Sequence, residues 1–176
     1  CAARSAGIPL ILLKGAATAH LAYPEPALRP MRDLDVLVQP ADLPVLYPVL
    51  DRMGFVTPVS QSSLMISDKH LPHAELKRGG LTVTLEVHTR LFDSLWRPQQ
   101  PSAAELFQRA RPFEIEGQPT LSLSLEDLLW HTWQHLVIED IRLNGIADLL
   151  SLSQRYVDEI DWGLIKKLYP GLLGTL

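Results

Sequence analysis

The spacing of apolar and polar residues predicts an α/β front followed by a helical tail. Short apolar runs bounded by Gly, Pro or Asp are typical of strands, and apolar residues three or four apart after a cap signal are typical of helices. Expected strands cover 8–15 and 34–39, expected hairpins 73–91 and 111–123, and expected helices 15–23 and 40–55. Pro48 should kink or shorten the last of these helices, because proline lacks the amide N–H that an α-helix uses.

From Ser124 onward the pattern becomes helical. The sequence Ser-Leu-Glu-Asp resembles a Ser-x-x-Glu capping box, with Asp127 in the Glu position. An apolar stripe with helical spacing follows, formed by Leu125, Leu128, Leu129, Thr132, Trp133, Leu136 and Val137. A second helix is expected at about 141–154 and a third from Asp161.

We therefore predict an α/β (α+β) fold, with a small mixed β-sheet core flanked by helices over 1–123 and a C-terminal helical region over 124–176. The 176 residues suffice for one domain with its own core, or for one domain with a small appendage. The sequence does not begin with Met, so we expect a piece of a longer protein in which the helical region is incomplete.

Composition narrows the functional classes. Hydrophobic residues make up 47% of the chain and charged residues 20%, as in ordinary globular proteins. The net charge of −4 argues against a broad basic surface, so no long nucleic acid is expected as a partner. No apolar run is long enough to span a bilayer, which predicts a cytoplasmic protein without a membrane partner. Cys1 is the only cysteine, which excludes a metal cluster of several thiolates within the chain.

Two carboxylates open the strand expected at 34–39. Because strand side chains alternate, Leu34, Val36 and Val38 share one face, which can be buried. Asp33 and Asp35 share the other face, with Cα atoms roughly 6 to 7 Å apart. Two carboxylates this close repel each other unless a cation binds them, and Mg²⁺ typically takes one or two carboxylates together with phosphate oxygens.

The later segment "LTVTLEVHTR" repeats this arrangement. Its apolar face consists of Leu81, Val83, Leu85 and Val87, and its polar face of Thr82, Thr84, Glu86 and His88. If this strand lies beside the first, Glu86 joins Asp33 and Asp35 on one face. Three carboxylates can hold two metal ions about 3.5 to 4 Å apart, the arrangement used for in-line phosphoryl displacement. The alternative is that the aspartates are solvated and form salt bridges with Arg29 or Arg32.

A lysine-glycine turn joins the first expected strand to the first expected helix. Gly15 permits a tight turn and a close backbone approach, and the start of a helix offers free N–H groups to an anion. Lys14 adds a positive charge that suits a phosphate. Strand-Gly-helix junctions are also common without a ligand, so this motif alone is a weak signal.

Together, "LLKGAATAHLAYPEPALRPMRDLDVLV" and "LEVHTRL" resemble the nucleotidyltransferases of the DNA polymerase beta superfamily. The resemblance is greatest to the bacterial family of uncharacterised nucleotidyltransferases, and it spans nearly the whole chain. That family has Lys-Gly after its first strand, Arg before Asp-x-Asp, Glu-x-His on a later strand, and a His-x-x-x-His-like pattern with a downstream Asp. The matching residues here are Lys14, Gly15, Arg29, Asp33, Asp35, Glu86, His88, His131, His135 and Asp148.

The resemblance implies a metal-dependent transfer of an NMP group from an NTP, such as ATP, to a small-molecule or protein acceptor. Asp33, Asp35 and Glu86 are then the catalytic residues and the ligands of two Mg²⁺ (or Mn²⁺) ions. The nucleotide-binding residues are Lys14, Gly15, Arg29 and Arg32, and the possible acceptor-lining residues are His88, His131 and His135.

Two other hypotheses stay open at this point. Other superfamily members carry Gly-Gly or Gly-Ser where Lys14-Gly15 stands, with a shorter gap than the 17 residues that separate Gly15 from Asp33 here. This difference is compatible with a non-catalytic relative that binds or regulates. A metal-dependent hydrolase could instead use His131 and His135, whose i, i+4 spacing suits a metal, but the Glu that zinc proteases place after the first His is absent. We therefore expect structural or substrate-lining roles for these two histidines.

Overall fold

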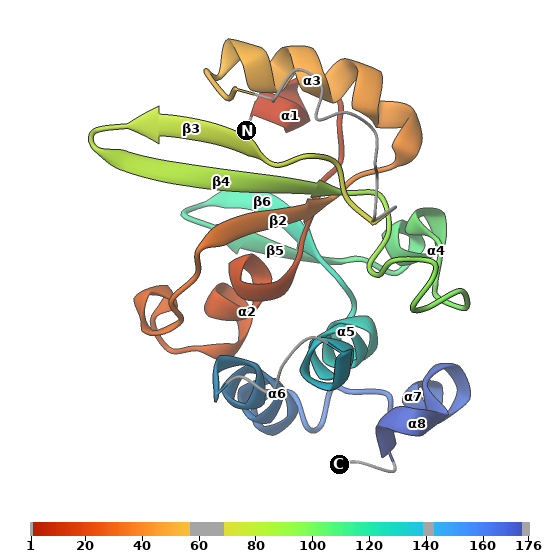
Figure 1. Cartoon of the computed structure of the whole chain (residues 1–176). Helices are drawn as coiled ribbons and strands as arrows, with labels where there is room; N and C mark the ends of the chain where they lie inside the picture. The colour runs from red at the N-terminus through yellow and green to blue at the C-terminus, as the bar shows by residue number, and fades with distance from the viewer. Residues whose placement is uncertain (1, 57–68, 139–142, 174–176) are drawn as a thin grey trace.

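A six-stranded mixed β-sheet forms the centre of the molecule, with helices on both of its faces (Figure 1). The computed structural model describes residues 2–56, 69–138 and 143–173. The strands are β1 (Ile11–Leu12), β2 (Asp33–Leu37), β3 (Ala74–Arg78), β4 (Leu81–His88), β5 (Arg111–Ile115) and β6 (Gln118–Ser122), in the spatial order β3-β4-β2-β1-β6-β5. β2 is parallel to β4 and β1 to β6, whereas the other neighbouring pairs are antiparallel.

The helices lie mostly between and after these strands. They are α1 (Ala2–Ser5), α2 (Lys14–Ala22), α3 (Leu43–Arg52), α4 (Ala103–Gln108), α5 (Leu125–Ile138), α6 (Leu143–Arg155), α7 (Trp162–Leu168) and α8 (Pro170–Leu173), with 3₁₀ turns η1 (Pro26–Leu28) and η2 (Pro40–Asp42). The mixed sheet flanked by helices confirms the predicted α/β class. Among the described residues, no helix is both long enough and apolar enough to cross a bilayer.

Two hydrophobic clusters cover the two faces of the sheet. One joins β2 and β4 to α1 and α3, and the other joins β1 and β2 to α2, α5, α6 and α7 (Figure 1). β2 serves both, since Val36 belongs to the first cluster and Leu37 to the second. By strand alternation Asp33 and Asp35 share the face of Leu37, so the carboxylates lie at the margin of the second cluster.

α5 packs in the same cluster as the sheet strands β1 and β2. All six strands precede residue 123 and α5 to α8 follow it, so secondary structure changes at the predicted boundary between 1–123 and 124–176. Whether these two parts are separate domains stays a prediction.

Both predicted hairpins are present, and left-handed residues form their turns. Gly79 and Gly80 have φ values of 58° and 79° between β3 and β4, where a side chain would be strained. The second turn uses Glu116, with φ of 50°, and Gly117. The two hairpins lie at opposite edges of one sheet.

Some predicted boundaries are wrong. β1 contains only Ile11–Leu12 instead of 8–15, because Lys14 takes a left-handed φ of 45° and starts α2. Helix α3 continues past Pro48 to Arg52, so this proline does not end it. Helix α4 was not predicted, although Ser102 and Glu105 form a complete capping box at its start.

The apolar face predicted for β4 is buried only along its second half. Leu85 and Val87 are 5% and 3% exposed, whereas Leu81 and Val83 are 72% and 41% exposed because the hairpin projects beyond the helical layer (Figure 1). Near the end of α5, Val137 of the predicted apolar stripe is also exposed.

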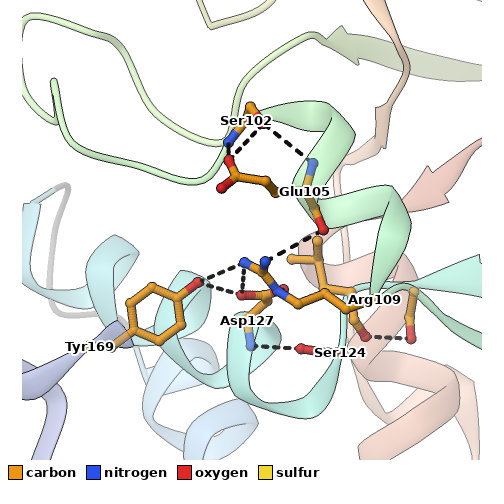
Figure 2. A network of polar contacts seen from close by, with 8 residues as sticks. Ser102, Glu105, Arg109, Ser124, Asp127 and Tyr169 are labelled. Atoms are coloured by element: carbon orange, nitrogen blue, oxygen red, sulfur yellow. Dashed lines mark hydrogen bonds and ion pairs between the residues drawn. The ribbon is translucent and has the colours of Figure 1, made fainter. Parts of the chain in front are cut away.

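A buried polar network anchors the start of α5 (Figure 2). The Ser124 hydroxyl accepts a hydrogen bond from the Asp127 amide at 3.2 Å, as the predicted cap requires. The Asp127 carboxylate, however, binds the Arg109 guanidinium at 2.5 and 2.9 Å and accepts a hydrogen bond from Tyr169. Burial, followed by the Asp127 charge, raises the pKa of Tyr169 well above its ordinary value. Asp127 therefore ties α5 to the ends of α4 and α7.

Candidate active site

The two acidic strands are neighbours in the sheet, as the carboxylate hypothesis requires. β2 pairs with β4 in parallel, so that Asp35 is opposite Glu86 and Asp33 is opposite Thr84. The side chains of Asp35, Glu86 and His88 each offer one ligand atom, and these atoms lie within 4.8 Å of one another. Two carboxylates and an imidazole thus converge on one face.

Asp35 is the buried centre of this group, with a relative exposure of 2%. Its Oδ1 atom lies 2.9 Å from Lys14 Nζ and 2.8 Å from His88 Nε2. Burial alone would raise the pKa of Asp35, but the hydrogen bond from His88 and the charge of Lys14 lower it well below its ordinary value. Asp35 is therefore held as a carboxylate.

The other two carboxylates are more exposed and differ from each other. The hydrogen bond with His88, whose Nε2 lies 3.5 Å from Glu86 Oε2, lowers the pKa of Glu86. Burial raises the pKa of Asp33, and the nearby charges of Asp35 and Glu86 raise it further. Asp33 lies outside the set of ligand atoms within 4.8 Å. The group that converges is thus Asp35, Glu86 and His88, with Asp33 one pleat away.

In the Lys14-Gly15 turn, the residue with the strained backbone is not the one that we expected. Lys14, not Gly15, has the left-handed backbone, with φ of 45°. Gly15 is needed for another reason: a Cβ atom there would lie 2.8 Å from Arg29 Nη1 and 3.2 Å from Arg29 Cζ. The glycine permits close approach of an arginine side chain, and the lysine approaches the carboxylates.

Arg29 does not pair with Asp33 or Asp35. Its Nη2 lies 2.7 Å from Asp148 Oδ2, and its Nε lies 3.1 and 3.2 Å from the two Asp148 oxygens. Tyr23 donates a further hydrogen bond to Asp148 Oδ1 at 2.7 Å. The salt bridges proposed between Arg29 and the aspartates of β2 are therefore absent, and Arg29 instead joins the segment before β2 to helix α6. We call this group the Arg29–Asp148 clasp.

A cavity of about 460 Å³ lies beside these residues. Lys14, Gly15, Asp33 and Asp35 line one part of it, together with Arg29 and the exposed Arg32. Helices α5 and α6 line another part through His131, Thr132, His135, Leu136, Asn144, Gly145 and Asp148. The contributions of Tyr23 to the clasp and of Asn144 and Gly145 to this wall were not predicted, because no motif marks them in the sequence.

The histidines of α5 lie against this cavity and pair with each other. His131 Nε2 is 3.1 Å from His135 Nε2, and the ring of Phe92 packs against both at centroid distances of 5.2 Å. Burial, and then the proximity of His135, lowers the pKa of His131 well below its ordinary value, so that it is neutral. Among the described residues, neither belongs to a group of three potential metal ligands.

His88 lies below the cavity rather than on its surface. Its relative exposure is 0%, and its Nε2 faces Asp35 Oδ1. Orientation of a carboxylate therefore agrees better with the geometry than the contact with an acceptor that the resemblance implies for His88.

The donor set fits a hard divalent cation. Carboxylate oxygens are the ligands that Mg²⁺ prefers, and Asp35 and Glu86 supply them from adjacent strands. Both contacts of Asp35 with Lys14 and His88 fall on Oδ1, so among the described residues Oδ2 is the oxygen that remains for a metal. His88 then acts as an outer partner that fixes the carboxylate.

Comparisons with known proteins identify a family and similar folds for the chain. A family model described as uncharacterised nucleotidyltransferase matches residues 2–169. A search of curated proteins gives no match. Among solved structures, an antigenic nucleotidyltransferase-like protein from Paracoccidioides brasiliensis has a TM-score of 0.58 at 20% identity, covering 98% of this chain and 85% of that one.

Two antibiotic-modifying proteins have similar folds. ANT(2")-Ia, in complex with adenylyl-2"-tobramycin, has a TM-score of 0.59 at 15% identity and covers 98% of this chain and 91% of its own. The lincosamide antibiotic adenylyltransferase LnuA, with lincomycin bound, has a TM-score of 0.51 at 15% identity and covers 86% and 89%. At these identities the likeness shows the fold.

Proposed function

The chain belongs to the uncharacterised nucleotidyltransferase family, and from this premise we propose that it transfers an NMP group from an NTP to a small-molecule or protein acceptor in a metal-dependent reaction. Family membership confirms the expectation of a nucleotidyltransferase. The roles of individual residues, the metal, the acceptor and the predicted cytoplasmic location are parts of the proposal.

One observation carries the proposal. Asp35 and Glu86 are register partners on parallel neighbouring strands, and Asp33, one pleat from Asp35, lines the adjacent cavity. A structural ion pair needs only one carboxylate for one cation, whereas two or three acids on one face of a sheet concentrate negative charge without a structural need. Perturbed acidic groups beside a cavity are candidates for a catalytic site.

We assign the metal-binding role to Asp33, Asp35 and Glu86. A bound Mg²⁺ would neutralise the negative charge of the phosphate oxygens and orient them. His88 holds Asp35 from below through its 2.8 Å hydrogen bond. Lys14 supplies a positive charge at the cavity, and the first amides of α2, including that of Gly15, are placed where a helix start binds phosphate.

In the proposed reaction a nucleophilic group of the acceptor, such as a hydroxyl, attacks the α-phosphorus of the NTP. A bond forms between the acceptor oxygen and phosphorus, the bond to the β-phosphate oxygen breaks, and pyrophosphate leaves. The proton of the hydroxyl passes to a carboxylate.

The acceptor would occupy the part of the cavity formed by α5 and α6. The printed descriptions of ANT(2")-Ia and LnuA name an adenylylated tobramycin and lincomycin, which are small molecules. The cavity of about 460 Å³ is also within the usual range for small-molecule sites. Both points favour a small molecule over a protein acceptor.

Calorimetry of ATP binding tests the proposal without knowledge of the acceptor. We expect Mg²⁺ to raise the ATP affinity of the unmodified chain by about tenfold or more, and Asp35→Asn to abolish this gain. Glu114→Gln is the matched control, because it neutralises an exposed carboxylate on β5, at the far edge of the sheet. ATP binding that is unchanged by Mg²⁺ would contradict the proposal, and so would a failure of the chain to bind ATP at all. Either result would favour a non-catalytic binding or regulatory protein.

A further inference from the structure

We propose that Lys14 is a cation switch, which neutralises Asp35 while the nucleotide site is empty and moves to the phosphates when nucleotide binds. This inference rests on the proposed function. It goes beyond it because it makes the release of Asp35 a consequence of nucleotide binding.

The first step of the argument is the position of the lysine amine. Lys14 Nζ lies 2.9 Å from Asp35 Oδ1, and the two side chains are 24% and 2% exposed. The ammonium group therefore stands beside a carboxylate that a metal would need. A cation and a metal beside the same buried carboxylate repel each other, so binding of the metal is weakened while the lysine stays there.

The second step is the backbone of Lys14. Its φ of 45° lies in the left-handed region, which Gly and Asn adopt readily and lysine rarely. The strained conformation at the first residue of α2 gives no advantage to helix formation. We infer that the side chain is the reason for a lysine at this position, since a glycine would adopt the same backbone without strain.

The third step is the neighbourhood of the amine. Lys14 and Gly15 line the same cavity as Asp33 and Asp35, at the start of α2, where the first amides of a helix are available to an anion. A triphosphate in this cavity would offer the ammonium group several oxygens in place of one. The lysine side chain is long and partly exposed, so it can exchange Asp35 for a phosphate without movement of the helix.

A double-mutant cycle on ATP binding in EDTA tests the switch, because no metal contributes to the result. In the unmodified chain Asp35 competes with ATP for Lys14, so Asp35→Asn should tighten ATP binding by about tenfold. The Lys14→Met/Asp35→Asn double variant should bind ATP no more tightly than the Lys14→Met variant, although it lacks the same negative charge that Asp35→Asn removes. If Asp35→Asn tightens ATP binding equally with and without Lys14, the effect is general electrostatics and the switch is refuted.

A second measurement does not depend on the folding of Asp35→Asn. Without nucleotide, Lys14→Met should bind Mn²⁺ about tenfold more tightly than the unmodified chain, as measured by electron paramagnetic resonance. Arg52→Met is the control: it removes one positive charge from the exposed surface of α3, outside the residues that line this cavity, and we expect less than about a twofold change. Equal effects of the two variants would overturn the proposal.

The outcomes also separate this inference from the proposed function. If Mg²⁺ raises the ATP affinity of the unmodified chain and the mutational effects in EDTA are additive, the nucleotidyltransferase proposal stands and the switch fails. If the chain binds no ATP with or without metal, both fail.

Discussion

Replacement of Arg29 by methionine should destabilise the protein strongly, because it leaves the Asp148 carboxylate buried without its cation. Asp148 has a side-chain exposure of 4% and Arg29 of 15%, and three N–O distances between them are 3.2 Å or less. Loss of one partner from a buried ion pair costs about 3 to 5 kcal/mol. Tyr23 still donates to Asp148 and Arg29 is partly exposed, so we expect the lower end, about 3 kcal/mol.

Urea unfolding measures this effect directly. For a chain of this size the slope of the free energy of unfolding is about 2 kcal/mol per M urea, so the midpoint should fall by about 1.5 M. Arg52→Met is the control, since it removes an exposed arginine from α3 and should change the free energy by less than about 0.5 kcal/mol. The Arg29→Met/Asp148→Leu double variant should regain much of the loss, because it removes both charges.

A different outcome would restore the role that the family resemblance implies for Arg29. If Arg29→Met shifts the midpoint no more than Arg52→Met does, and ATP binding is lost, then Arg29 binds nucleotide and the clasp contributes little to stability. If the double variant is as unstable as the sum of its two single variants, the two residues do not act as a pair.

Three further predictions follow from neighbouring contacts. Gly15→Ala should cost about 1 to 3 kcal/mol in urea unfolding, because its Cβ would meet Arg29 Nη1 at 2.8 Å, and the cost should fall in an Arg29→Ala background. Tyr169→Phe removes two hydrogen bonds from the network in Figure 2, the one donated to Asp127 and the one accepted from Arg109, and should cost about 1 to 2 kcal/mol by the same assay. Burial and then Asp148 raise the pKa of Tyr23 to about 12, so ultraviolet titration of Asp148→Asn should show this pKa moving toward 10, with Tyr23→Phe identifying the signal.

The elements that the sequence predicted well are those whose signals are local. In both hairpins the turn residues stand between two runs of alternating apolar and polar residues. Helix α5 follows Ser124, whose hydroxyl accepts a hydrogen bond from the amide of Asp127, three residues later. β1 was predicted too long because its extent depends on partners elsewhere. Ile11 and Leu12 pair with β2 on one side and with β6, more than 100 residues later, on the other. Such pairings are not encoded in the apolar run itself.

The parts of the site that were predicted also depend on local signals, whereas the parts that were missed depend on residues far apart in the sequence. Alternation placed Asp35 and Glu86 on the polar faces of their strands, and only the adjacency of β2 and β4 was needed to bring them together. The partner of Arg29 could not be found in this way, because Asp148 is 119 residues away on another element. Nothing local distinguishes an arginine that binds a helix from one that binds a phosphate.

The clasp also gives a physical account of the unusual spacing in the motif. The 17 residues between Gly15 and Asp33 include most of α2, the turn η1 and Arg29, and this segment reaches helix α6 through Asp148. A shorter connection would bring the chain directly from the helix to β2 and would leave no residue to hold α6 at that position. Because α6 lines the same cavity as Asp33 and Asp35, the long spacing is compatible with an active site. The long spacing allows Arg29 to hold α6, which forms part of the cavity wall. By itself it does not favour a non-catalytic relative.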